Sequence, residues 1–127
     1  MAKKEFNYCG KNIEDLKKMS MDEFAKLLPA RQRRSLTRGF TDAQKRFLKS
    51  LKVKKDNVKT QCRDMVIIPE FVGKTILIHR GNNFDRVLIT TEMLGHYLGE
   101  FTYNRKKVAH SAPGIGATRS SAAISVK

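Results

Sequence analysis

The sequence predicts an α+β protein, with N-terminal helices, a small antiparallel or mixed sheet around a β-hairpin, a short helix and an extended basic C-terminal tail. Three observations support this. Two capping-box patterns precede apolar residues at helical spacing, two β-branched runs flank a Gly-Asn-Asn turn, and core-forming residues end near residue 101. We therefore expect an N-terminal arm over 1–19, one α+β domain with an N-terminal helical extension over 20–101 and a basic tail over 102–127.

The first half of the chain carries the helical signals. Ser20 to Glu23 and Thr41 to Gln44 each have the residue types of a capping box,. The first box opens a short helix that Pro29 ends, and the second opens a helix over 42–56.

The helix over 42–56 has two different sides. Spacing at 100° per residue gives it an apolar side, formed by Ala43, Phe47, Leu48 and Leu51. The opposite side carries a row of lysines, Lys45, Lys49 and Lys52. This pattern indicates either ordinary amphipathicity or a ridge that follows phosphates, and periodicity favours neither.

The segment 30–40, between the two helices, holds a cluster of arginines. They are Arg31, Arg33, Arg34 and Arg38, and no acidic residue lies between Lys26 and Asp42 to balance them. A solvated charged face is the alternative. Because arginine forks onto phosphate and stacks on bases, we favour contact with nucleic acid.

The second half of the chain changes to an extended pattern. Residues 75–80 and 84–89 carry β-branched residues and flank the turn 81–83, which predicts a β-hairpin,. Its tip carries polar and basic side chains, namely His79, Arg80, Asn82, Asn83 and Arg86.

A short helix is expected after the hairpin, over 91–99. Thr90 or Thr91 would cap its start and Gly99 would end it. Its apolar face would be formed by Met93, Leu94, Tyr97 and Leu98.

The tail over 102–127 contains five basic residues and no acidic one. Such a segment cannot offset its ordering entropy alone, so we expect disorder until a partner is met. A flexible end without a function is the alternative, but the missing acidic residues favour RNA contact. The residues expected to supply charge, donors or close backbone approach are Arg105, Lys106, Lys107, His110, Gly114, Gly116 and Arg119.

The net charge narrows the class of partner. The chain has 26 Lys and Arg residues against 12 Asp and Glu, a formal charge of +14. Self-repulsion of this size opposes folding, so a polyanion is the expected partner. No stretch approaches the roughly 20 apolar residues that span a bilayer, and the N-terminus lacks the apolar core of a secretory signal. We expect no membrane partner and a reducing compartment, since Cys9 and Cys62 form no CxxC pair,.

No catalytic motif stands out. His79, His96 and His110 fall on a strand end, a short helix and a tail, whereas a general acid–base pair must be held rigidly together. A small ribonuclease is therefore disfavoured, and we expect no enzyme, metal, cofactor or small-molecule substrate. Basic groups spread along the whole chain suit structured RNA, which is recognised by shape, phosphates and 2′-hydroxyls.

Three segments resemble the small-subunit ribosomal protein S-nineteen family. PEFVGKTILIHRGNNFDRVLITTEMLGHYLGEF (69–101) resembles the family core, most specifically in L-G-x-x-L-G-E-F at 94–101. HSAPGIGATRSS (110–121) and LLPARQRRSLTRGF (27–40) resemble the archaeal and eukaryotic branch. Arg80 and Asn104 depart from the pattern, which usually has small polar residues at these positions.

The resemblance implies a structural constituent of the small ribosomal subunit, located in the cytoplasm on the ribosome. It implies binding to the 3′ major domain of ribosomal RNA in the subunit head, with ribosomal protein S-thirteen as a neighbour and a bridge to the large subunit nearby. The tail, over 113–121, would extend towards transfer RNA at the decoding side. Further RNA-contacting residues would be Lys74, Ser120 and Ser121. The competing function is a free-standing, sequence-nonspecific RNA- or DNA-binding chaperone.

Overall fold

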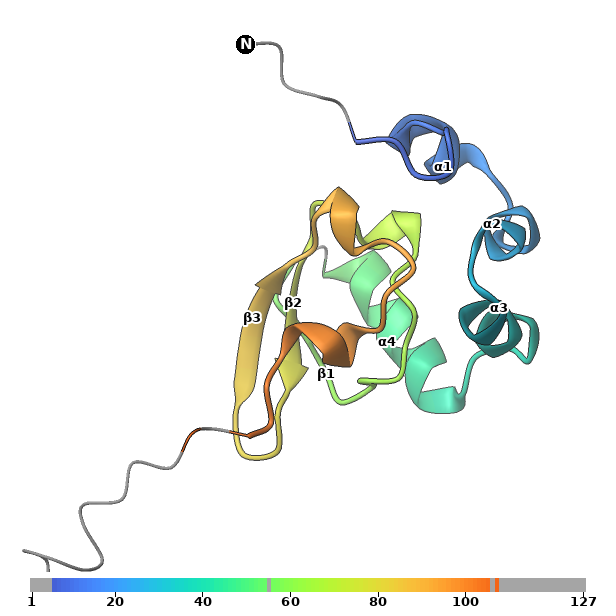
Figure 1. Cartoon of the computed structure of the whole chain (residues 1–127). Helices are drawn as coiled ribbons and strands as arrows, with labels where there is room; N and C mark the ends of the chain where they lie inside the picture. Colours follow the sequence, from blue (N-terminus) through green and yellow to red (C-terminus); the bar gives the residue numbers. More distant parts are fainter. Residues whose placement is uncertain (1–5, 55, 106, 108–127) are drawn as a thin grey trace, which may run out of the picture.

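A computed structural model describes residues 6–54, 56–105 and 107. It places a three-stranded sheet on one side, an arc of three helices on the other, and a longer helix between them (Figure 1). The predicted α+β class is confirmed. The helices are α1 (Ile13–Lys18), α2 (Met21–Leu27), α3 (Ala30–Thr37) and α4 (Asp42–Val53).

Both predicted capping boxes form. The Ser20 hydroxyl accepts the Glu23 N–H at 3.3 Å, and the Glu23 carboxylate accepts the Ser20 N–H at 3.2 Å. Thr41 and Gln44 make the corresponding pair at 3.4 and 3.1 Å. Each box satisfies two of the amides that a helix start leaves without a partner.

Helix α4 differs from its prediction at two points. It ends at Val53 rather than at residue 56. Ala43 is exposed, and Gln44 is buried in its place beside Phe47 and Leu51. The buried Gln44 side chain is satisfied by hydrogen bonds, because it accepts the Thr41 N–H and donates to Asp64 at 3.2 Å,.

The predicted hairpin is confirmed within a mixed sheet of order β1-β2-β3. Strand β1 (Val58–Thr60) runs parallel to β2 (Thr75–His79), which pairs antiparallel with β3 (Phe84–Leu88). The Arg80 N–H donates to the Asn83 carbonyl at 2.9 Å and closes the turn. Side chains alternate along the strands, so Val58, Ile76 and Ile78 are buried under α4 and its neighbours,.

A buried run, 65–68, crosses between β1 and β2 and leads into the 3₁₀ turn η1 (Pro69–Phe71). This run pairs with a segment 28 to 33 residues further along the chain rather than with the sheet. The Ile67 N–H donates to the His96 carbonyl at 2.8 Å, the Gly95 N–H to the Ile67 carbonyl at 3.1 Å, and the Leu98 N–H to the Met65 carbonyl at 3.0 Å.

The helix predicted over 91–99 is wrong. The segment forms two 3₁₀ turns, η2 (Thr91–Met93) and η3 (Leu98–Phe101), and no threonine side chain caps η2. Its backbone is used in pairing with 65–67, and Gly95 has a φ of +79°, which is incompatible with a continuous helix,. Gly99 lies inside η3 instead of ending a helix.

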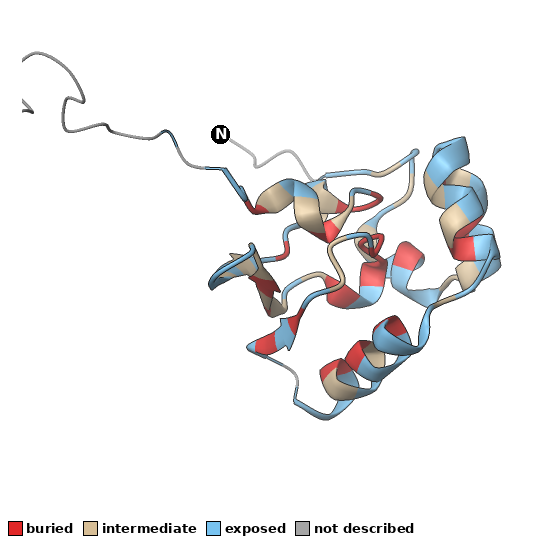
Figure 2. Cartoon of the chain, turned by 90° about the horizontal axis from the view of Figure 1, so that it is seen from below, coloured by how far each residue is buried: buried red, intermediate tan, exposed pale blue. Residues whose placement is uncertain are grey.

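The core joins both halves of the chain. Buried residues lie on the inward sides of the helices and on the inner face of the sheet, whereas the outer surfaces are exposed (Figure 2). Phe47 of α4 meets Phe71 of η1 edge-to-face at a centroid separation of 5.8 Å. Leu16 of α1 also enters this core, at 2% exposure. No helix among the described residues has the length and apolar character needed to cross a membrane.

Candidate nucleic-acid interface

The α3 arginine cluster (Arg31, Arg33, Arg34 and Arg38) is fully displayed on the surface, but its members have two different roles. The Arg33 guanidinium donates to the Leu28 carbonyl at 3.0 Å and the Lys26 carbonyl at 3.3 Å. It thereby satisfies carbonyls at the end of α2. Within the described part of the chain, no ion pair or hydrogen bond engages the other three guanidinium groups.

Two of these arginines line a hollow of about 610 Å³ between α3 and α4, here called the α3–α4 hollow. Arg31 and Arg38 lie on its wall, and its one carboxylate, Asp64, already accepts a hydrogen bond from Gln44. Further lining comes from Ser35, Gly39, Thr41 and Tyr97. Guanidinium groups beside hydroxyls suit a phosphate, which accepts several charge-assisted hydrogen bonds.

The lysine row of α4 faces solvent as a ridge. Lys45, Lys49 and Lys52 are all exposed. Lys45 lies 3.5 Å from Asp42, but both side chains are more than half exposed, so the pair contributes little,. The ridge and the α3 cluster meet where α4 begins, because Thr41 and Gln44 also line the hollow.

The hairpin tip uses part of its predicted set to build the turn itself. Arg80 pairs with Asp85 at 3.2 Å, and its side chain is only 19% exposed. The His79 ring packs on Phe84 at a centroid distance of 4.9 Å, and its Nδ1 accepts the Gly81 N–H at 3.3 Å. Asn82 and Asn83 are exposed.

Two predicted residues lie away from this tip. Arg86 is exposed on the outer face of the sheet, in register with Leu77. Lys74 is half-buried just before β2, at the opposite end of the strand from the turn. The structure therefore divides the predicted hairpin residues among three places.

Arg63 is an organising residue that is not among the residues predicted from the sequence. Its guanidinium donates to the His79 carbonyl at 2.8 Å, to the Gly99 carbonyl at 2.7 Å, and to both the carbonyl and the hydroxyl of Thr102. One half-buried side chain thus joins the end of β2, the turn η3 and the start of the tail. No sequence signal could have found it, because its partners are mostly backbone carbonyls 16 to 39 residues away.

Beyond Thr102 the chain passes the hairpin turn (Figure 1). Tyr103 and Asn104 join Arg80, Gly81 and Asn82 around a hollow of about 340 Å³, here called the tip notch. Arg80 and Asn104, the two departures from the family pattern, therefore lie together. Arg105 and Lys107 follow and are exposed. Other predicted tail residues lie outside the described residues; they are Lys106, His110, Gly114, Gly116, Arg119, Ser120 and Ser121.

The described histidines have separate partners. His96 lies 2.7 Å from a carboxylate oxygen of Glu100, whereas His79 packs against Phe84 at the hairpin. His110 is outside the described residues. Across residues 6–54, 56–105 and 107, no group of three His, Cys, Asp or Glu side chains is placed to hold a metal ion.

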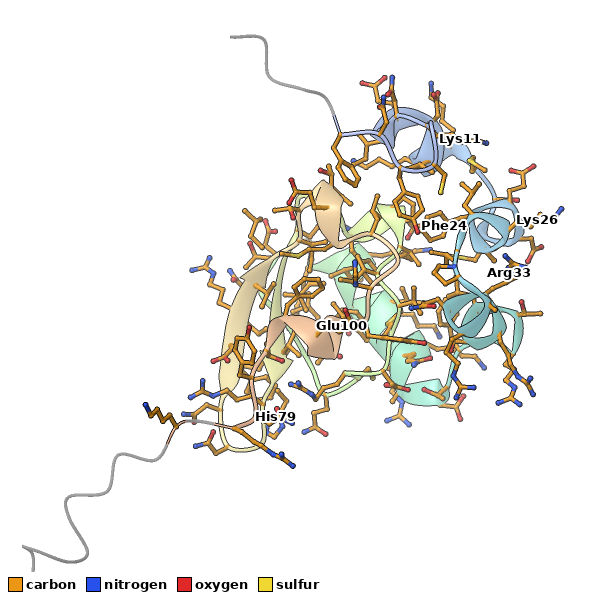
Figure 3. All side chains as sticks on the ribbon, in the orientation of Figure 1. Lys11, Phe24, Lys26, Arg33, His79 and Glu100 are labelled. Carbon is orange, nitrogen blue, oxygen red and sulfur yellow. The ribbon has the colours of Figure 1, made fainter. Side chains whose placement is uncertain are left out.

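Two groups of basic side chains thus emerge from one predicted set. The first combines the α3 cluster with the α4 ridge, and the second combines the hairpin tip with the start of the tail. Figure 3 shows nitrogen-tipped side chains along the lower edge of the molecule, from α3 past the start of α4 to the turn near His79. The arrangement offers extended phosphate binding rather than an enclosed catalytic site.

Comparison with known proteins gives a consistent result. The family model described as "Ribosomal protein S19" matches residues 34–110. Two similar proteins are named "Small ribosomal subunit protein uS19", from Thermoplasma acidophilum and Thermoplasma volcanium. They are 49% and 48% identical over 124 residues, which cover 98% of this chain and 82% of each relative.

Proposed function

This chain belongs to the ribosomal protein S19 family, and we propose that it is a structural constituent of the small ribosomal subunit that binds ribosomal RNA. The observation that carries the proposal is the near-complete match to two proteins named for that subunit, at 49% and 48% identity. The names of these relatives describe a ribosomal protein and no enzyme activity.

The surface chemistry supports RNA as the partner. Three guanidinium groups of α3 and the lysine ridge of α4 stand in solvent, where a phosphate backbone would release counterions on binding,. The groups proposed to anchor the folded part in RNA are Arg31, Arg34, Arg38, Lys45, Lys49 and Lys52. Arg33, by contrast, would act by holding α2 against α3.

The finer placement follows from the family resemblance. The chain would lie in the head of the subunit on the 3′ major domain of the RNA, beside ribosomal protein S-thirteen and near a bridge to the large subunit. The segment 113–121 would reach towards transfer RNA at the decoding side. The folded part would thus anchor the chain in the RNA of the head, and the tail would reach the decoding side.

A competition titration tests the RNA-binding function. The purified chain is titrated with the isolated head domain of small-subunit ribosomal RNA at about 150 mM salt, in an excess of unrelated structured RNA, because salt governs such affinities. Retained, saturable binding is expected. Complete loss to the competitor would instead favour the nonspecific chaperone.

Truncation tests the division of labour. A chain that ends after Val108 is expected to keep its affinity for the head-domain RNA within about threefold. Of all lysines and arginines in the sequence it loses only Arg119 and Lys127, and each phosphate contact adds modestly to the affinity,. Loss of incorporation into small subunits on this truncation would contradict the proposed anchor.

A further inference from the structure

We propose that the tip notch binds a single unpaired nucleotide of RNA, with its base stacked on Tyr103. This inference rests on the RNA-binding function proposed above and adds a specific subsite to it. The notch is formed by Arg80, Gly81, Asn82, Tyr103 and Asn104, and is an open hollow of about 340 Å³. Tyr103 was absent from the residues predicted from the sequence.

Tyr103 is an unusual surface residue. Tyr103 is 81% exposed, although the residue just before it, Thr102, is only 3% exposed. A large aromatic ring held in water has no stabilising role inside this fold. Nucleobases stack on such rings, and this is a common way for proteins to hold single-stranded RNA.

The backbone just before Tyr103 is held by Arg63. Arg63 fixes the Thr102 backbone by donating to its carbonyl at 2.7 Å, and the same guanidinium donates to the His79 carbonyl at 2.8 Å. Tyr103 therefore starts from a fixed point beside the hairpin turn. This preorganisation reduces the entropy that would otherwise be lost when a nucleotide orders the segment.

The other walls of the notch supply polar recognition. Asn82 and Asn104 carry amides that both donate and accept, so they can pair with the edge of a base,. Gly81 adds no side chain that would occupy the space. One nitrogen of Arg80 is held by Asp85 at 3.2 Å, and the remaining guanidinium donors can face a phosphate,.

Charge favours RNA over a protein segment as the occupant. Among the described residues, no acidic side chain lines the notch, and the Asp85 carboxylate of the hairpin already pairs with Arg80. Arg105 and Lys107 follow Asn104 directly and are exposed. An apolar protein side chain would meet amides and a guanidinium instead of an apolar surface.

The test uses paired RNA hairpins that are identical except for one unpaired nucleotide in the stem, made with each of the four bases. The full chain is compared with Tyr103→Leu, which removes the ring, and Tyr103→Phe, which keeps it. Wild type and Tyr103→Phe should prefer the bulged hairpin. Tyr103→Leu should lose this preference, with affinity for the bulged RNA falling roughly 5- to 100-fold, the range for loss of one base stack.

The outcomes separate this inference from the function it rests on. If wild type shows no preference for the bulged hairpin, or if Tyr103→Leu keeps that preference, the proposed nucleotide site in the notch is wrong, even if head-domain RNA is bound selectively. If the preference depends on the ring, the nucleotide site is supported even when the chain does not select head-domain RNA over other RNA. In that case only the proposed ribosomal function is contradicted. Because Tyr103 is exposed, equal thermal unfolding of all three proteins is expected and excludes a folding defect.

Discussion

The helical half of this protein, residues 6–54, and its sheet half, residues 56–105, are stabilised in different ways. In the helical half, the main polar devices are local. Each capping box joins residues three positions apart. In the sheet half they are distant, because Arg63 reaches up to 39 residues along the chain and 65–67 pairs with 95–98.

The contrast extends to the basic residues. In the helical half, Arg31, Arg34 and Arg38 are exposed without a described partner. In the sheet half, Arg63 and Arg80 are half-buried and bonded within the fold, whereas Arg86 and Arg105 are exposed. A net charge of +14 therefore does not describe a uniform RNA-binding surface. Some arginines build the fold and others remain available to RNA.

The largest effect is expected from Arg63→Ala. Four hydrogen bonds from a charged group would be lost and several carbonyls left without a partner, at a cost of about 4 kcal/mol in unfolding free energy,. Arg33→Ala is the matched control, since it breaks two contacts of an exposed side chain and should cost about 0.5 kcal/mol,. Urea denaturation measures both. Equal losses would remove the distinction between the halves.

The next effect concerns Gly95, which allows the sheet half to meet the helical half. A Cβ there would lie 2.7 Å from Leu28 Cδ2, at a φ of +79°. Gly95→Ala should therefore cost about 3 kcal/mol, from overpacking and left-handed strain together.

Gly39 provides the comparison for that variant. It has a φ of +88° but no atom within 4 Å of an added Cβ. Gly39→Ala should cost only the strain, about 1 kcal/mol. If the unfolding temperature shifts equally for both variants, the close approach of an added Cβ at Gly95 to Leu28 does not contribute to the loss of stability.

A smaller effect is expected from each helix cap. Ser20→Ala and Thr41→Ala should each cost about 1 kcal/mol, because each removes the acceptor of a helix-start amide,. Thr90→Ala is the control in the sheet half, since Thr90 precedes η2 without a side-chain cap and should change stability by less than about 0.3 kcal/mol,. If Thr90→Ala lowered the unfolding free energy as much as the two cap variants, Thr90 would stabilise η2 through a local interaction that the structure does not show.

The smallest effect on stability is expected at Lys45. Its pair with Asp42 is exposed, so Lys45→Ala should change unfolding free energy by about 0.3 kcal/mol and less at high salt,. If the ridge follows phosphates, the same variant should lower the salt slope of RNA binding by about one. An unchanged slope would leave the lysine row as ordinary amphipathicity.

The same contrast explains what the sequence could predict. Ser20, Thr41 and the hairpin at 75–89 were predicted because their signals act between neighbours in sequence. The segment 91–99 was mistaken for a helix because its apolar spacing competes with backbone pairing to Ile67, which no local pattern reveals.

The candidate site follows the same rule. The arginines of α3 were predicted from a local cluster without neighbouring acidic residues, whereas Arg63 and Tyr103 acquire their roles only when distant segments meet. Sequence spacing also could not distinguish Arg33 from its neighbours, because its partners are backbone carbonyls at the end of α2.

The most direct test of the account is the salt dependence of binding to head-domain RNA for a variant that carries Arg31→Ala, Arg34→Ala and Arg38→Ala. If these side chains neutralise phosphates, the slope of log affinity against log salt should fall by about two to three, with unfolding unchanged. Arg33→Ala should keep most of the slope. An unchanged slope in the triple variant would contradict the claim that the exposed arginines of the helical half are the RNA anchor.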